Sequence, residues 1–173
     1  MAIYAYGDRI PQIDATAWVF PSADIIGDVR IGPGAYIGAG AIIRGDYGTI
    51  IIEEGVAIEE NVTIHASPQG ECRIEKNAVI GHMAMLHGCT IRQEAVVGMS
   101  AVVTNDAVVG VGAIIGEGAV VKSRTQIPDY SIAVGIPAKI KGEVSKSVKR
   151  YWKAAGNIYR QLAIDYPKKL RKL

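Results

Sequence analysis

The sequence predicts a mainly β fold, a parallel β-helix followed by one C-terminal α-helix. The 173 residues include 25 Ile and 17 Val but only 4 Leu, and β-branched side chains favour strands over helices. Gly occurs 20 times, and aromatic residues make up only 6% of the chain. A six-residue apolar repeat also runs through most of the sequence. Together these observations exclude a helical bundle and disfavour an ordinary β-sandwich, whose core usually contains more large rings.

The repeat appears when the chain is followed in steps of six from Ile13 or from Ile91. Two shorter series lie between these long ones, and the positions are Ile13, Val19, Ile25, Ile31, Ile37, Ile43, Ile52, Ile58, Ile64, Ile74, Ile80, Leu86, Ile91, Val97, Val103, Val109, Ile115, Val121 and Ile127. A small residue often stands two places earlier, as at Ala95, Ala101, Ala107, Ala113 and Ala119. Residues two apart on a strand point to the same side, so we expect both to face the core.

A short strand and a turn every six residues produce stacked coils, each of which needs its neighbours to bury its core. The pattern resembles the hexapeptide-repeat family over roughly residues 11–138. This resemblance implies a single-stranded left-handed parallel β-helix with triangular coils of about 18 residues, three hexads each. The left hand comes from the resemblance alone, because crossovers between parallel strands are usually right-handed.

The tail of the chain has a different character. We expect a β-helix domain over residues 1–142 and a helix over residues 143–173 that packs on it. Apolar residues recur there at spacings of three and four, which predicts an amphipathic helix over about residues 143–166, limited by Pro167. The stripe consists of Val144, Val148, Tyr151, Trp152, Ala155, Ile158, Tyr159, Leu162 and Ala163.

Composition predicts a cytoplasmic protein that binds neither nucleic acid nor a membrane. The chain has no apolar run of about 18 residues, and its start lacks the pattern of a secretory signal. Cys72 and Cys89 are too few for a disulfide framework, so we expect two buried free thiols. Residues 141–173 carry 10 basic and 2 acidic residues. We interpret this charge as a solvated helix face, because no nucleic-acid motif accompanies it.

The repeat slips at three places, with a step of nine after Ile43, ten after Ile64 and five after Leu86. Breaks in a regular repeat are where functional residues tend to lie. The second break contains residues 66–72, and the three histidines of the chain, His65, His82 and His87, flank it.

His65 and His87 each follow a repeat position, and 22 residues separate them, which is one coil of about 18 residues plus the extra residues of the loop. They should therefore stand one above the other outside the core, about 4.8 Å apart. Neutral imidazoles held so close are typical metal ligands. The alternative is that the three histidines are unrelated residues that lie on the surface or make hydrogen bonds.

His82 lies one hexad before His87 and therefore around a corner of the coil, away from the pair in its own chain. In a threefold assembly, His82 of a neighbouring chain would face that pair. Three histidines with an open fourth position form the pattern of a catalytic zinc site, where bound water is acidified to a pKa near 7.

Three segments carry a closer resemblance: IRGD at 43–46, IEENVTIH at 58–65 and IGHMAMLHGC at 80–89. They resemble γ-class carbonic anhydrases, and still more the short subclass that includes phenylacetate-pathway thioesterase-like and ferripyochelin-binding-type proteins. The resemblance implies a homotrimer with a metal at each interface, bound by His65 and His87 of one chain and His82 of the next. It also implies Zn²⁺ as the metal, with Fe²⁺ or Co²⁺ as alternatives.

The same resemblance assigns roles to Arg44 and Asp46. Arg44 would form an ion pair between chains, with Glu60 as a candidate partner. Asp46 would lie near the metal-bound water or the substrate. The alternative for both is a surface pair at the end of a strand.

Two further site residues differ from the family pattern or extend it. Glu59 stands where the family usually has Gln, and an ionised Glu cannot donate a hydrogen bond to the metal water. Close to a cation it should stay ionised, so Glu59 could act as a base or as a further ligand. Tyr159 could supply a polar group from the tail helix, or simply pack in its apolar stripe. The proton-shuttle acids of the archetypal enzyme are absent, and Tyr47 and residues 66–68 occupy their places.

The leading hypothesis is a carbonic anhydrase-like enzyme in which metal-bound hydroxide hydrates CO₂ to bicarbonate. An acyl-CoA thioesterase using the same metal site is the second enzyme hypothesis. An acyltransferase, the commonest activity of this fold, ranks lower because such enzymes usually use a lone catalytic histidine. A non-catalytic metal-binding or assembly module is the fourth, and Glu59 keeps it open.

Overall fold

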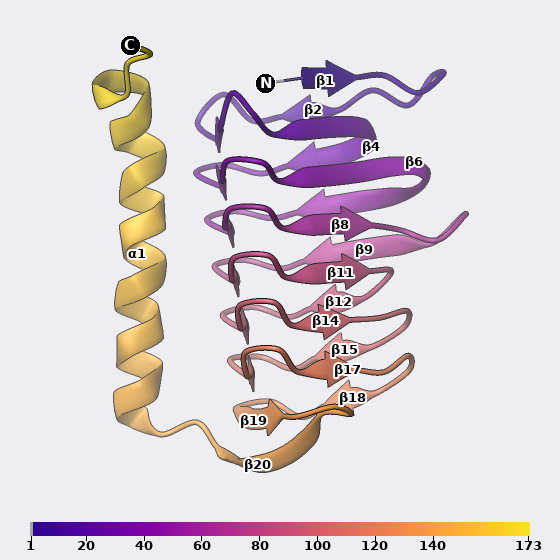
Figure 1. Cartoon of the computed structure of the whole chain (residues 1–173), viewed down its shortest axis with the longest axis vertical. Helices are drawn as coiled ribbons and strands as arrows, with labels where there is room; N and C mark the ends of the chain where they lie inside the picture. Colours follow the sequence, from indigo (N-terminus) through magenta and orange to yellow (C-terminus); the bar gives the residue numbers. More distant parts are fainter. Residues whose placement is uncertain (1) are drawn as a thin grey trace.

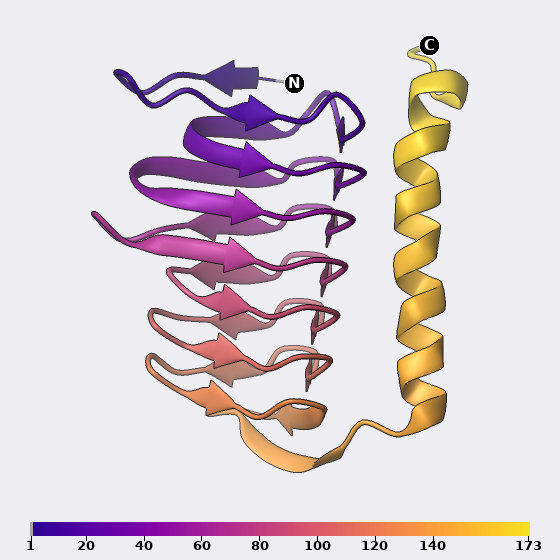
Figure 2. The same cartoon turned by 180° about the vertical axis from the view of Figure 1, so that it is seen from behind.

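The structure, a computed structural model, describes residues 2–173 and shows a parallel β-helix with one C-terminal α-helix (Figure 1). The chain winds in coils that stack along the long axis of the molecule, from the N-terminal coil at one end to β20 at the other. The helix α1 (Lys146–Lys169) runs back beside the stack toward the N-terminal coil, as Figure 2 shows from behind. This confirms the predicted fold class.

Two faces of the stack belong to one 12-stranded sheet. The first face contains β1 (Ala2–Tyr4), β8 (Thr63–His65), β11 (Met85–His87), β14 (Val102–Val103) and β17 (Val120–Val121). The second contains β2 (Gln12–Ile13), β9 (Glu71–Ile74), β12 (Thr90–Ile91), β15 (Val108–Val109) and β18 (Gln126–Ile127). The long strands β4 (Asp24–Ile31) and β6 (Ile42–Ile52) continue round the corner and pair on both faces.

The third face is an eight-stranded sheet that α1 covers (Figure 1). Seven of its strands pair in parallel: β3 (Trp18–Val19), β5 (Tyr36–Ile37), β7 (Ala57–Ile58), β10 (Val79–Ile80), β13 (Val96–Val97), β16 (Ile114–Ile115) and β19 (Ser131–Val134). The last strand, β20 (Lys139–Glu143), is antiparallel to β19. It closes the C-terminal end of the stack, where no further coil follows.

The core confirms the six-residue repeat. Apart from half-buried Ile13, all the repeat positions are buried. They stack in register from coil to coil, as Ile64, Leu86 and Val103 do on the first face. The alanines two places earlier are fully buried as well. Each coil therefore pairs a bulky and a small inward residue, and burial of these apolar side chains is the main stabilising term of the fold.

The helix differs in two details from the prediction. It begins after Ser145, whose hydroxyl accepts a hydrogen bond from the Val148 amide, and it continues through Pro167 to Lys169. Proline removes one backbone hydrogen bond, which is tolerated here because the helix ends within three residues.

The buried face of α1 is also narrower than the predicted stripe. Gly156 and Ala163 are buried, and Trp152 and Tyr159 pack against the third face. By contrast, Tyr151 is 67% exposed and Ile158 is 62% exposed. Apolar spacing predicted the helix but not which of two adjoining stripes would face the sheet.

Two simpler expectations can be compared directly with the structure. Cys72 and Cys89 are buried free thiols, as predicted. Among residues 2–173, no helix has the length and apolar character needed to cross a membrane.

Candidate metal centre

The site on the first face is positioned by three successive coils. His65 and His87 are the last residues of β8 and β11 and pair in register, and Arg44 of β6 pairs with His65. The preceding residue of each strand is a fully buried repeat position. Because side chains alternate along a strand, Arg44, His65 and His87 all point outward at one corner. The imidazole rings lie 5.0 Å apart between centroids, which confirms the predicted stacking.

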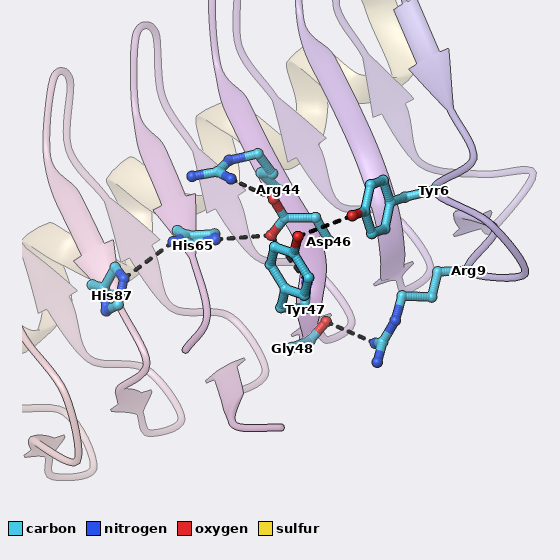
Figure 3. Close-up of polar contacts among 8 residues, drawn as sticks. All are labelled: Tyr6, Arg9, Arg44, Asp46, Tyr47, Gly48, His65 and His87. Carbon is cyan, nitrogen blue, oxygen red and sulfur yellow. Dashed lines mark hydrogen bonds and ion pairs between the residues drawn. The ribbon is translucent and has the colours of Figure 1, made fainter. Parts of the chain in front are cut away.

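Asp46 joins this stack because β6 bulges at the corner. Gly27 and Gly45 are paired there, and a Cβ on Gly27 would lie 2.3 Å from the Gly45 carbonyl oxygen, so only glycine fits. This close approach lets Asp46 turn its carboxylate toward His65. The N-terminal segment holds the same corner from outside: the hydroxyls of Tyr6 and Tyr47 are 3.1 Å apart, and Arg9 donates to the Gly48 carbonyl (Figure 3).

The polar side chains form one continuous chain of contacts (Figure 3). The guanidinium of Arg44 donates to one carboxylate oxygen of Asp46, and the other oxygen lies 2.9 Å from His65 Nε2. His65 Nδ1 lies 3.1 Å from His87 Nε2. Finally, His87 Nδ1 contacts the amide oxygen of Asn105.

This arrangement suits an assignment of the ring protons that favours a metal. The outer nitrogens of His65 and His87 face oxygen acceptors, to which each can donate a hydrogen. With that assignment the two inner nitrogens present lone pairs to each other and can share a cation, either one proton or a metal ion. Histidines that bind a metal usually donate their other ring N–H to a carboxylate or carbonyl, as these two can.

The separation of the inner nitrogens also fits a metal. Zn–N bonds are about 2.0–2.1 Å long and the site is tetrahedral, which puts two ligand nitrogens roughly 3.3 Å apart. The observed 3.1 Å is close to that value. The residues present are therefore suited to hold an ion with two ligands from one chain.

The charge of Asp46 favours a cation at this place. Its side chain is almost fully buried, which alone would raise its pKa, but hydrogen bonds from His65 and Arg44 and from the Tyr47 amide outweigh burial and lower it. Asp46 is therefore ionised at neutral pH, and its negative charge stabilises a positive charge on the imidazole pair.

His82 belongs to a second cluster on the third-face side. It follows β10, and its ring nitrogens lie 3.0 Å from Glu59 Oε2 and 2.8 Å from Glu60 Oε2. Its backbone amide also donates to Glu59. Within one chain, residues 2–173 contain no group of three or more His, Cys, Asp or Glu side chains placed to hold a metal. The structure thus separates His82 from the His65–His87 pair, as the spacing of one hexad predicts. A metal site shared between chains stays a prediction.

Glu59 and Tyr159 lie in the cluster around His82 and not beside His65 and His87. Glu59 is only 5% exposed, and the Tyr159 hydroxyl of α1 donates a hydrogen bond to its carboxylate. Burial raises the pKa of Glu59, opposed by the Tyr159 hydrogen bond and by His82. Within one chain Tyr159 both packs in the apolar stripe and supplies a polar group, so the two interpretations of this residue hold together.

The ion pair expected between Arg44 of one chain and Glu60 of the next stays a prediction, because the structure describes a single chain. Arg44 pairs with Asp46, while Glu60 accepts a hydrogen bond from the Tyr36 hydroxyl and pairs with His82. An ion pair between chains would have to compete with these contacts.

Sequence reasoning missed Asn105 and Tyr36. Asn105 had only a partial signal: the coil after His87 is one residue short, so position 104 is in register with His87, and Asn105 lies one residue beyond it. Tyr36 had none, because an apolar aromatic on the third face gives no indication of its hydroxyl partner.

Comparison with known proteins places the chain in a family. No family model matches the sequence. The carnitine operon protein CaiE of Citrobacter koseri is 40% identical over 164 residues, which cover 95% of this chain and 83% of that protein. CaiE of Salmonella typhi is also 40% identical, over 165 residues and with the same coverage. The chain belongs to the hexapeptide-repeat family that includes CaiE.

Solved structures support membership of the hexapeptide-repeat family. A Bacillus cereus protein described as a "putative acetyltransferase" superposes with a TM-score of 0.94 at 32% identity, covering 95% of this chain and 96% of that one. A hexapeptide transferase family protein from Anaplasma phagocytophilum gives 0.92 at 32% identity, covering 95% and 98%. These matches establish the left-handed β-helix. Their names refer to acyl transfer, the activity that the sequence ranked third, and none refers to carbonic anhydrase.

Proposed function

We propose that this protein is a metal-dependent, carbonic anhydrase-like enzyme that hydrates CO₂ to bicarbonate at the interfaces of a cytoplasmic homotrimer. His65 and His87 of one chain and His82 of the next would hold the ion. The observation that carries the proposal is the pair of inner ring nitrogens, 3.1 Å apart, on rings whose outer nitrogens both face an oxygen acceptor.

A metal ion held by these residues would lower the pKa of a bound water to near 7 and so would supply a nucleophile at neutral pH. Three neutral imidazoles suit Zn²⁺, and Fe²⁺ or Co²⁺ are alternatives. Asp46 and Asn105 hold His65 and His87 in the ligand tautomer, and Arg44 fixes the Asp46 carboxylate. In the single chain both ring nitrogens of His82 contact carboxylates, one on Glu59 and one on Glu60, so one contact would have to open when His82 binds the ion. Glu59, with the Tyr159 hydroxyl hydrogen-bonded to it, would then be the candidate proton acceptor.

Acyl-group chemistry is the second candidate, and the names of the solved relatives at 32% identity favour it. The same site could act on the thioester carbonyl of an acyl-CoA, either hydrolysing it or transferring the acyl group. A non-catalytic metal-binding or assembly module is the third. Both alternatives share the metal-site geometry with the leading proposal, so only measurements of enzymatic activity can distinguish the three.

The test combines metal content with two assays. Protein purified without oxygen and loaded with Zn²⁺, Fe²⁺ or Co²⁺ should contain one ion per chain and hydrate CO₂, and His65→Ala should lose both properties. Thioester hydrolysis or acyl transfer without CO₂ hydration would favour the second candidate. Bound metal with none of these activities would favour the non-catalytic module, and Glu59→Gln would show whether Glu59 prevents hydration.

A further inference from the structure

A cavity of about 310 Å³ lies between α1 and the third face. Its floor is apolar and formed by outward side chains of β10, β13 and β16, namely Val79, Val96 and Ile114, with Trp152 of the helix beside them. The volume is at the lower end of that of small-molecule sites. The cavity lies beside α1, whereas His65 and His87 end strands whose arrows point away from the helix (Figure 1).

The wall of the cavity carries more positive than negative charge. Lys149, Lys153 and Arg160 of α1 line it, together with one acidic residue, Glu94. Lys149 is already engaged, 3.4 Å from Glu94 and above the Tyr130 ring. Two cations therefore remain without a carboxylate partner.

Of Lys153 and Arg160, Arg160 gives the stronger indication of an anion-binding site. Its guanidinium donates to the Gly55 carbonyl and to the Asn157 side chain but forms no ion pair with any described residue. Burial lowers its pKa, and the charge of Glu94 only partly opposes this. A partly buried guanidinium is usually matched by a carboxylate or phosphate. Gly156 makes room for it, because a Cβ there would lie 3.3 Å from Arg160 Nη1.

Lys153 extends the charge across the cavity mouth. It lies two turns before Arg160 on the same helix, and its side chain makes no hydrogen bond or ion pair with another residue between 2 and 173. Its ammonium is therefore free to meet an anion whose other side contacts Arg160.

We propose that this cavity binds a small organic anion, with a carboxylate or phosphate group held by Arg160 and Lys153 and an apolar body on Val79, Val96, Ile114 and Trp152. Asn77 and Asn157 at the rim could hydrogen-bond polar atoms of the same molecule. This site is independent of the proposed metal centre, and so is its test.

Binding can be measured by calorimetry at low ionic strength with three probes: phenyl phosphate, benzoate and inorganic phosphate. We expect one saturable site per chain, and the tighter of the two aromatic probes identifies the preferred head group. Inorganic phosphate should bind more weakly than phenyl phosphate because it leaves the apolar floor uncovered. In a Trp18→Phe background, the fluorescence of Trp152 should change on binding.

Matched variants distinguish binding of the anion in this cavity from a general attraction to the positive charge of α1. Arg160→Gln should weaken binding about tenfold or more, since it removes a charged hydrogen-bond donor. Lys153→Gln should act in the same direction and has no structural contact to lose. Lys168→Gln removes the same charge from the last turn of α1, away from the cavity, and should leave the Kd within about twofold. Absence of saturable binding to the wild-type protein, or an equal effect of all three variants, would overturn the proposal.

Discussion

At the scale of single residues, the decisive feature is how the protons are placed on two stacked imidazoles. Asp46 and Asn105 can accept hydrogen bonds from opposite ends of the pair, which leaves the lone pairs of the two inner nitrogens free to share a cation. These two partners touch the rings only at the nitrogens that would not bind a metal. They should therefore tune metal affinity without removing the ligands.

The first prediction concerns Asp46→Asn. The amide keeps an acceptor oxygen but loses the negative charge, so the affinity for Zn²⁺ should fall by about 10- to 100-fold. Competition with a chromophoric chelator measures it. Asp106→Asn is the matched control, because that exposed carboxylate adjoins Asn105 in sequence but makes no hydrogen bond or ion pair with another described residue. Unchanged affinity in Asp46→Asn would mean that Asp46 does not support the ligands.

The second prediction uses the pH dependence of stability. The hydrogen bonds to Asp46 lower its pKa in the folded protein, so its ionised form stabilises the fold above the unfolded pKa of about 3.9. That stabilisation is lost as the pH falls through the folded value. The metal-free wild-type protein should therefore exceed Asp46→Asn in unfolding free energy at neutral pH, and the gap should close toward about pH 3. Urea denaturation at several pH values measures this, and a gap that widens in acid would contradict it.

At the scale of elements, the strands follow from the sequence more closely than the helix does. Each repeat position has an identical environment one coil above and below, so one rule of spacing predicts the buried side of nearly all the short strands. The spacing of His65 and His87 follows from the same rule. The helix packs against a surface that no local pattern describes, and for this reason Tyr151 and Ile158 were expected to be buried and are exposed.

The partners of individual polar groups were the least predictable part. Adding one coil to His87 leads to position 104, next to Asn105 but not to it. The pairing of Glu60 with Tyr36 and His82 depends on which side chains share the turn of the coil. The antiparallel strand β20 was missed for a similar reason. It closes the end of the stack, where the repeat no longer applies.

The third prediction tests how α1 is held on the third face. Tyr166 contacts Trp18, Phe20 and Tyr36, with ring centroids 5.8, 6.2 and 5.9 Å away. Tyr166→Ala should lower the unfolding free energy by about 2 kcal/mol, since each aromatic pair contributes roughly 0.5–1.5 kcal/mol beyond its burial. Ile158→Ala, on the exposed face of the same helix, should change it by no more than about 0.5 kcal/mol. Equal effects in chemical denaturation would show that the helix is not anchored by this aromatic cluster.

At the scale of the whole molecule, the two histidine clusters lie on different sides of each coil. His65 and His87 stand at the corner that closes the first face, whereas His82 follows a third-face strand. One chain alone therefore offers two candidate metal ligands, His65 and His87, at one corner and a third, His82, at another. A closed threefold ring would bring the two kinds of cluster together at every interface, which is the central claim of the proposed function.

Mixed trimers test this claim most directly. His82→Ala lacks one kind of ligand, and the double variant His65→Ala/His87→Ala lacks the other, so neither should bind an ion tightly alone. After the two variants are co-refolded, each mixed trimer should regain about one intact interface and one bound ion. Native mass spectrometry with metal analysis counts both. If His82→Ala alone keeps one tightly bound ion per chain, or if mixed trimers form and remain metal-free, the shared site does not exist.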